Sequence, residues 1–469
     1  MTEKKPSIRK QSLARSFTAS LAGLRAGGAL ALDGVRQKIT GEEGDSDFSR
    51  REARLFVEKL GRLKGSYVKI GQMLAMFGEH FLPPVLTEAL HELEDKTQPV
   101  PWSELEPTVA AALGDAYREI DVEPEAVAAA SLAQVHRATI KSTGDTICLK
   151  IQYPDLPRII DSDFDGVVRM LKAARWLKVG RDLDEWLETM RAQLHQEADY
   201  QREVTITESM KALLNQSHEA GDRSSTTTAS IRVPTIYRQY CRPTIIAMEF
   251  FTGNSVKEAS IKDLPLASRN ALGLAMLTLF FREVFDWGLM QTDPNFGNYL
   301  VSLGSKQEPG LALCLIDFGS VLELEPTQRS ELKRVIVGGL ANDDGEIEAG
   351  LRGLGWLKAD ASAEAVDLFV RFCRYLLEPL RPAEQLPVER LNAQGDYRWH
   401  ESELIQRVGK RGAKNAASQH FQMPSSDFSL FARKLTGVFT FIAYLRAEFN
   451  AYPELARFLE SESTPERRT

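Results

Sequence analysis

Three side chains in the second half of the sequence have the types and spacing that phosphoryl transfer requires. Asp293 and Asn298 lie five residues apart in the segment Gln291-Thr-Asp-Pro-Asn-Phe-Gly-Asn, and Asp317 begins an Asp-Phe-Gly triplet after an apolar stretch. In such a pattern the first aspartate orients the nucleophile, while the asparagine and the second aspartate hold magnesium. The triplet alone is common by chance, but here it ends a strand–turn–strand pattern. We therefore predict that Asp293 is catalytic and that Asn298 and Asp317 are magnesium ligands.

A lysine and a run of small residues upstream could bind phosphates. Lys150 lies in the apolar strand pattern Thr146-Ile-Cys-Leu-Lys-Ile-Gln-Tyr, where an ammonium group is costly unless it has an anionic partner. Before it, Ala128, Ala129, Ala130 and Ser131 form a turn whose backbone N–H groups could approach phosphate oxygens closely. A solvated lysine on an edge strand and a tightly packed turn are the simpler interpretations of these two features.

The anionic partner is expected on a single helix predicted over residues 183–213. Asp199 and Glu203 share a face of that helix at i,i+4, a pairing that repels unless a cation lies between the two carboxylates. Glu197 lies about 240° around the helix from Glu203, so one helix can present carboxylates to two sites. Either acid could pair with Lys150, and a solvated helix face is the alternative.

A second basic residue lies on an earlier helix, which the apolar spacing predicts over residues 48–77. Gly61, Gly65, Lys69 and Gln72 lie opposite its apolar seam. Because each glycine in a helix costs roughly 1 kcal/mol relative to alanine, this face suggests a close approach by another element. We expect the seam and the polar face to have different partners; a surface face with tolerated glycines is the alternative.

The remaining elements predict an α+β chain. Strands are expected over 128–140, 146–153, 231–238, 244–251, 299–303 and 311–316, and helices over 159–177, 264–287 and most of the chain after Pro326. The last helix, over 428–449, follows a Ser-Ser-Asp cap. Glu249 ends an apolar strand, at the position where a two-lobed kinase binds adenine through its hinge.

Composition excludes several classes of protein. The chain has 469 residues, of which 43% are hydrophobic and 26% charged, as in ordinary globular proteins. Its net charge of −7 argues against a nucleic-acid partner, and four scattered cysteines indicate a reducing cytosol. No apolar stretch of about 20 residues predicts a membrane span. Residues 1–40 nevertheless carry a net charge of +6, so this segment is either a solvated tail or a peripheral contact with an anionic membrane.

Together these motifs resemble the UbiB-like (AarF-domain) atypical kinases, which include the mitochondrial members required for coenzyme Q synthesis. The family's KxGQ motif is found in Lys69-Ile70-Gly71-Gln72, its alanine-rich loop in Ala128–Ala130 and its ExD motif in Glu197-Ala198-Asp199. The resemblance runs from about residue 50 to residue 340, with a weaker similarity over 429–445. The combination of KxGQ and ExD is specific to this family.

The resemblance implies a protein-kinase-like two-lobed fold that binds ATP or ADP with Mg2+. Lys150 would contact the α- and β-phosphates and pair with Glu203. The residues expected to lie beside the nucleotide as a regulatory group are Lys69, Gly71, Gln72, Glu197 and Asp199. The expected parts are a basic segment (1–47), a KxGQ helical extension (48–115), an N-lobe (116–250), a C-lobe core (251–345) and a helical C-terminal part (346–469).

The resemblance also implies a function. We expect an Mg-dependent ATPase or atypical kinase that supports isoprenoid-quinone or other lipid biosynthesis, with a quinone-precursor lipid and quinone-biosynthesis proteins as partners. A nucleotide-gated scaffold or lipid-presenting module without turnover is the alternative, and a protein kinase acting in trans is least favoured because the KxGQ helix should cover a peptide groove. Asn295-Phe296 replaces the bacterial His-Pro, which puts a housekeeping ubiquinone role in doubt, and Ser320 replaces a frequent alanine.

Overall fold

The computed structural model describes residues 47–63, 65–77, 81–91, 99–177, 183–219, 229–304, 310–416 and 425–460. The expected basic segment over 1–47 lies outside the described residues except for Asp47. The chain divides into two compact units, which are described separately. Unit 1 contains residues 1–204 and 236–250, and unit 2 contains residues 205–235 and 251–469. All residues after Phe250 belong to unit 2. The division into five parts that the sequence suggests stays a prediction.

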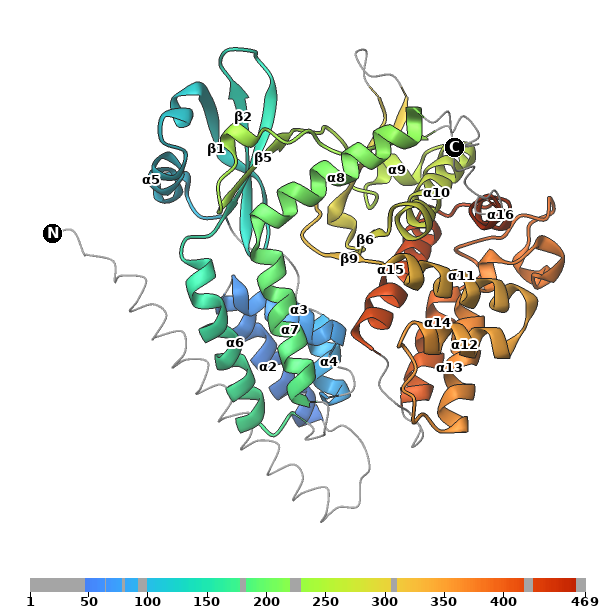
Figure 1. Cartoon of the computed structure of the whole chain (residues 1–469). Coiled ribbons are helices and arrows are strands. Elements are labelled where there is room, and N and C mark those ends of the chain that lie inside the picture. The colour runs from blue at the N-terminus through green and yellow to red at the C-terminus, as the bar shows by residue number, and fades with distance from the viewer. Residues whose placement is uncertain are drawn as a thin grey trace, which may run out of the picture. The chain divides into compact units, whose positions relative to one another are not determined.

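The described part of unit 1 combines helices with one antiparallel sheet (Figure 1). Its helices are α2 (Asp47–Leu63), α3 (Ser66–Phe77), α4 (Pro84–His91), α5 (Trp102–Leu113), α6 (Leu156–Ala173) and α7 (Leu183–Ala198). Its strands are β1 (Ile120–Ala129), β2 (Ala133–Ile140), β3 (Thr146–Gln152) and β5 (Ile245–Glu249), in the order β1-β2-β3-β5. Helix α5 packs Leu105 and Val109 against this sheet, whereas α2, α3 and α4 lie beside α6 and α7.

The helix predicted over 48–77 is two helices. The chain breaks between α2 and α3, where Gly65 has a φ of +62°. Only glycine adopts this left-handed conformation without strain, so Gly65 ends one helix instead of lying on the face of a continuous one. The apolar seam of the two helices is buried nonetheless, as the sequence predicts, through residues such as Phe56, Leu60 and Ile70.

The single helix predicted over 183–213 is also wrong. Helix α7 ends at Ala198, and a new helix, α8 (Tyr200–Glu219), begins after Asp199. The Asp199 carboxylate accepts hydrogen bonds from the backbone N–H groups of Gln201 and Arg202, at 3.1 and 3.0 Å. An aspartate that satisfies the free N–H groups of a first helical turn is a strong N-cap, and this explains why the new helix starts there.

Unit 2 is mostly helical around two small sheets. Strands β4 (Ala229–Arg232), β8 (Leu311–Leu315) and β7 (Tyr299–Ser302) lie in that order, and β6 (Leu289–Gln291) pairs with β9 (Val321–Glu323). The predicted β7–β8 hairpin is confirmed, whereas the strand expected over 231–238 ends at Arg232. The helices after α8 are α9 (Ala259–Lys262), α10 (Leu266–Phe281), α11 (Pro326–Ala341), α12 (Asp344–Gly353), α13 (Ala363–Leu376), α14 (Leu404–Ala416), α15 (Ser426–Tyr444) and α16 (Tyr452–Glu460).

The core of unit 2 forms where α10 and α15 pack together. Phe280 and Phe281 of α10 and Ile442 of α15 are at most 1% exposed. Helix α15 begins at the predicted cap, because the Ser425 side chain accepts a hydrogen bond from the backbone N–H of Phe428. None of the helices in the described ranges is long and apolar enough to span a bilayer. The whole arrangement belongs to the α+β class predicted from the sequence.

Candidate functional site

Lys150 in the middle of β3 pairs with Glu203 of α8. The Nζ atom lies 2.7 and 3.0 Å from the two carboxylate oxygens, and the side chains are 15% and 3% exposed. An ammonium group held by both oxygens of a nearly buried carboxylate forms a strong charge-assisted contact. Glu203 is therefore the partner of Lys150, as the family resemblance implies, and both residues belong to unit 1.

The alanine-rich turn lies in the same row of the sheet as Lys150. Ala128 pairs with Val135 of β2, Val135 pairs with Lys150, and Lys150 pairs with Ile246 of β5. Because neighbouring strands lie about 4.8 Å apart, Ala128 and Lys150 are separated by roughly 10 Å across the sheet. The turn itself closes through a hydrogen bond from the N–H of Ala130 to the carbonyl of Ala133, at 2.7 Å.

The exposure of this turn suits a ligand that approaches its backbone. Ala128 and Ala130 are exposed, Ala129 is half-buried and Ser131 is buried. Their side chains are short, so a ligand could reach the backbone N–H groups as it reaches a glycine-rich loop. Glu249, the expected hinge residue, ends β5, and no structural observation tests its contact with adenine.

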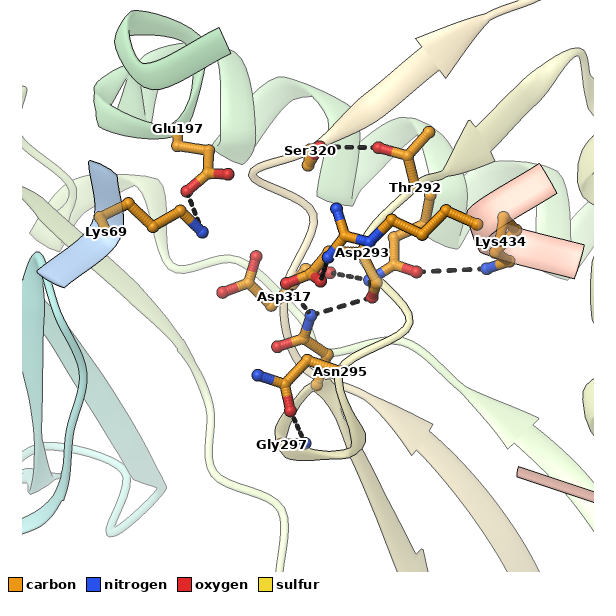
Figure 2. A network of polar contacts seen from close by, with 12 residues as sticks. Lys69, Glu197, Thr292, Asp293, Asn295, Gly297, Asp317, Ser320 and Lys434 are labelled. Carbon is orange, nitrogen blue, oxygen red and sulfur yellow. Dashed lines mark hydrogen bonds and ion pairs between the residues drawn. The ribbon is translucent and has the colours of Figure 1, made fainter. Parts of the chain in front are cut away.

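Lys69 of the KxGQ motif pairs with Glu197 of the ExD motif. The Lys69 Nζ atom lies 2.5 Å from Glu197 Oε2, and the side chains are 18% and 17% exposed (Figure 2). This ion pair joins α3 to α7 within unit 1. Gly71 is buried and Gln72 is half-buried on the same helix, and their expected role beside the nucleotide stays a prediction.

The ExD segment joins three parts of unit 1 because the chain turns at its aspartate. Glu197 binds Lys69, the carbonyl of Ala198 accepts a hydrogen bond from Gln152 Nε2 at 2.6 Å, and Asp199 caps α8. Gln152 ends β3, so the junction between α7 and α8 is tied directly to the strand that carries Lys150. The expected position of Asp199 beside the nucleotide stays a prediction.

In unit 2, Asp293 and Asn298 are held together by a tight turn. Asn298 Nδ2 donates to Asp293 Oδ2 at 3.0 Å and to the Asp293 carbonyl at 3.1 Å. Asn295 stabilises this turn, because its Oδ1 accepts from the N–H of Gly297 at 3.0 Å (Figure 2). Phe296 packs against α15, with its ring 5.8 Å from Phe441. Asn295 and Phe296, where bacterial members have His-Pro, thus both shape the loop.

The Asp-Phe-Gly triplet is fixed by its own backbone and by the residue after it. Asp317 Oδ1 accepts from the N–H of Gly319 at 2.9 Å, and Phe318 is 1% exposed in the core of unit 2. The Ser320 hydroxyl lies 2.6 Å from that of Thr292, and the N–H of Thr292 donates to the Ser320 carbonyl at 2.9 Å (Figure 2). Ser320 therefore joins the residue after Asp-Phe-Gly to the segment before Asp293 through its backbone and its hydroxyl, and an alanine would lose the hydroxyl contact.

The sequence analysis missed two residues of α15 that contact this loop. Arg433 Nη2 lies 2.5 Å from Asp293 Oδ1. Its neighbour Lys434 is fully buried and lies 2.8 Å from Glu283 Oε2, which is also fully buried. The sequence did contain signals for these contacts. Arg433 and Lys434 are adjacent basic residues in an otherwise apolar helix, and Glu283 lies inside an apolar helical stretch.

The buried lysine also positions the side chain of Gln291. Gln291 Oε1 accepts hydrogen bonds from Tyr299 Oη at 2.7 Å and from Lys434 Nζ at 3.2 Å. Burial raises the pKa of Tyr299 to about 12, so its hydroxyl stays protonated and can donate. Burial by itself lowers the pKa of Lys434, but the charge of Glu283, the influence of Tyr299 and the hydrogen bonds to both together outweigh it, so the pKa is raised. Lys434 is therefore a charged donor to the loop.

The two predicted magnesium ligands have the donor chemistry that this ion requires. Asn298 uses its amide nitrogen to bind Asp293, which leaves its amide oxygen as an acceptor, and Asp317 contributes a carboxylate. Oxygen ligands of this kind, completed by waters and phosphate oxygens, are typical of Mg2+. Within the ranges that the structure describes, no three His, Cys, Asp or Glu side chains gather into a metal cluster. The residues therefore fit Mg2+ bound together with a phosphate-bearing ligand.

The sheet with its lysine–glutamate pair and the strand β8 followed by Asp-Phe-Gly are features of a protein-kinase-like fold. The family model of the ABC1 atypical kinase-like domain matches residues 92–349, which is more than half of the chain. The chain belongs to this family of atypical kinases, and the resemblance to UbiB-like proteins seen in the sequence is confirmed.

Characterised and solved proteins resemble the chain over most of its length. Atypical kinase COQ8, mitochondrial, from Schizosaccharomyces pombe is 27% identical over 87% of this chain and 63% of that protein, so the chain spans less than two thirds of it. Atypical kinase COQ8B, mitochondrial, from Rattus norvegicus is 27% identical over 92% of this chain and 78% of its own. A solved structure of Rv3197 with erythromycin from Mycobacterium tuberculosis shares the fold, at 21% identity and a TM-score of 0.54 over 92% of this chain and 98% of that one.

Proposed function

We propose that this chain is an Mg-dependent ATP-binding atypical kinase or ATPase that supports isoprenoid-quinone or other lipid biosynthesis. The observation that carries the proposal is the Lys150–Glu203 ion pair, with distances of 2.7 and 3.0 Å, in the same sheet row as the alanine-rich turn. A lysine held in this way by a helix glutamate is the group that binds the α- and β-phosphates in kinases. The COQ8 relatives support a role near quinone synthesis.

The chain's own residues would divide the work of phosphoryl transfer. Lys150, fixed by Glu203, would hold the α- and β-phosphates, and the backbone of the alanine-rich turn would approach the phosphate oxygens. Asp293 would orient the nucleophile, a water or an acceptor hydroxyl. Asn298 and Asp317 would hold Mg2+, which when bound neutralises the charge that develops on the phosphoryl oxygens.

ATP hydrolysis by the full chain tests this proposal. The wild type, Asp317→Asn and a control variant, Asp367→Asn, are compared with and without anionic liposomes and a phenol that resembles a quinone precursor. Asp367 is a half-exposed residue of α13 that pairs with Arg371, so its loss should leave turnover unchanged. We expect turnover that rises with lipid or phenol and falls at least about 100-fold in Asp317→Asn, because a metal ligand is worth several kcal/mol. Equal turnover in the two variants would refute the catalytic assignment.

A nucleotide-gated module without turnover is the second candidate. The Lys69–Glu197 ion pair at 2.5 Å favours this candidate. The pair fastens the KxGQ helix α3 to α7, and a KxGQ helix held in place is expected to leave little room for a protein substrate. In this case ADP with Mg2+ would raise the unfolding temperature of the wild type but not of Lys150→Met, and no lipid or phenol would produce hydrolysis. Transfer of labelled phosphate to an added protein, lost in Asp293→Asn, would instead support a kinase acting in trans.

A further inference from the structure

Helix α15 lies along the loop that carries Asp293 and approaches it unusually closely. Arg433, Gly437 and Phe441 are four residues apart, so they lie on one face of the helix. Gly437 contacts Pro294, and a Cβ atom at Gly437 would overlap the proline ring. Phe441 stacks edge-on against Phe296, at 5.8 Å between ring centroids. This face of α15 therefore contacts the loop at three successive positions, and a side chain at position 437 would keep the helix from packing this closely against Pro294.

Arg433 completes the support of the Asp293 carboxylate. Its Nη2 atom binds Oδ1 at 2.5 Å, while Asn298 Nδ2 binds Oδ2 at 3.0 Å. A carboxylate held through both oxygens by two different donors cannot turn about its Cβ–Cγ bond without losing one of them. The Arg433 and Asp293 side chains are 25% and 20% exposed, so their ion pair is largely shielded from water. It holds the Asp293 carboxylate in one orientation.

The next residue of the helix fixes the backbone of the same aspartate. Lys434 donates to Gln291 Oε1 at 3.2 Å, and Gln291 Nε2 donates to the carbonyl of Asp293 at 2.9 Å. The same amide also reaches the carbonyl of Asp317 at 3.4 Å. Lys434 itself is anchored by Glu283 in the core. Two adjacent residues of α15 thus hold the side chain and, through Gln291, the main chain of Asp293.

We propose that Arg433 is a positioning residue for Asp293 and that α15 is the element that sets the geometry of the catalytic loop. The inference rests on the proposed function, because it concerns the orientation of the aspartate that would act in phosphoryl transfer. Arg433 acts through Asp293 and is not assigned a contact with the nucleotide. Its removal should therefore lower kcat and leave nucleotide binding intact.

Steady-state ATP hydrolysis by the full chain tests the role of Arg433. The variants are Arg433→Met, Arg433→Lys and the control Arg371→Met, which removes an arginine from a half-exposed pair with Asp367 on α13. We expect Arg433→Met to lower kcat about 10- to 100-fold, the size of effect that a misplaced reacting group causes. The KM for MgATP should match that of the control. Arg433→Lys should recover part of kcat, because it restores a cation.

Three kinetic results would overturn the inference. An unchanged kcat in Arg433→Met would show that Asp293 does not need this support. A raised kcat would make Arg433 an inhibitory latch, and a raised KM with unchanged kcat would make it a nucleotide-binding residue. Gly437→Ala supplies a second perturbation, since the added methyl group must displace Pro294 and should also lower kcat with little change in KM.

A crystal structure of Arg433→Met separates a failure of this inference from a failure of the proposed function. If the wild type neither binds nor hydrolyses the nucleotide, the proposed function fails and takes the catalytic part of the inference with it. If the wild type binds the nucleotide without turnover, the rotamer of Asp293 decides the inference. Loss of its bond to Asn298 Nδ2 in Arg433→Met would support positioning, whereas an unmoved carboxylate would refute it.

Discussion

The buried ion pair between Lys434 and Glu283 should be a major determinant of stability in unit 2. Both side chains are fully buried, and their charged atoms are 2.8 Å apart. Replacing Lys434 with methionine keeps most of the side-chain volume but leaves the Glu283 carboxylate without its cation. Removing one partner of a buried pair costs about 3–5 kcal/mol, because the remaining charge is uncompensated. A unit of this size loses roughly 2–4 °C in Tm per kcal/mol, so the loss in Tm should be about 6–20 °C.

A double variant separates the cost of the unpaired charge from the cost of altered packing. Lys434→Met combined with Glu283→Leu removes both charges and keeps apolar groups of similar size. Such replacements are often neutral or stabilising. We therefore expect the double variant to lie within about 1.5 kcal/mol of the wild type, as volume-conserving core substitutions usually do. Tyr299 can still donate to Gln291 in this variant, at the 2.7 Å seen here.

Urea unfolding followed by circular dichroism at pH 8 and pH 5.5 measures these effects, with Arg371→Met as the control for a surface ion pair. Burial raises the pKa of Glu283, and the Lys434 charge opposes that rise. Without Lys434 the pKa rises further, so the folded variant binds a proton that the unfolded chain releases. Its stability should therefore increase as pH falls from 8 to 5.5. A loss no larger than that of Arg371→Met, or one independent of pH, would refute this reasoning.

Two further predictions concern hydrogen bonds elsewhere in the chain. His136 is fully buried, with Nδ1 2.8 Å from the carbonyl of Glu123 and Nε2 2.7 Å from Gln134 Nε2, and burial lowers its pKa. The stability that the neutral His136 side chain contributes should be complete above pH 6.5 and should decline below that pH by up to about 1.4 kcal/mol per pH unit. Urea unfolding at several pH values measures this slope, which His136→Gln should reduce. Ser320→Ala should cost about 1–3 kcal/mol in urea unfolding, because it leaves the buried Thr292 hydroxyl without its partner, and adding Thr292→Val should recover most of that loss.

Motifs made of residues close in sequence were the part of the site that could be predicted. The five-residue spacing singled out Asp293 and Asn298, and the structure brings the two side chains together, with Asn298 Nδ2 3.0 Å from Asp293 Oδ2. Lys150 in an apolar strand predicts an anionic partner, but the residue types alone left Glu197 and Glu203 as equal candidates. Choosing between them requires knowing that the predicted helix ends at Ala198 and that a new one begins after the N-cap Asp199, so the two glutamates lie on different helices.

The contacts of α15 could not be predicted, because they join residues that are far apart in the chain. Arg433 and Asp293 are separated by 140 positions, and no local periodicity relates them. The pattern of α15 predicts a buried helix and its cap, and both are present. A hydrophobic pattern predicts which face of a helix is buried but not which loop that face covers. The sequence therefore shows Arg433 and Lys434 as two charges on an apolar helix and does not predict their partners.

The turn at Asp199 explains how one short segment can serve two lysines. In a continuous helix, Glu197 and Glu203 would lie about 240° apart around one axis and about 9 Å apart along it. Because Asp199 starts a new helix, the two glutamates do not share one helix: Glu197 remains on α7 while Glu203 belongs to α8. Each glutamate then reaches a different cation, Lys69 at 2.5 Å and Lys150 at 2.7 Å. The aspartate of the ExD motif therefore has a structural role that its spacing alone does not reveal: by capping α8 it places the two acidic side chains on different helices.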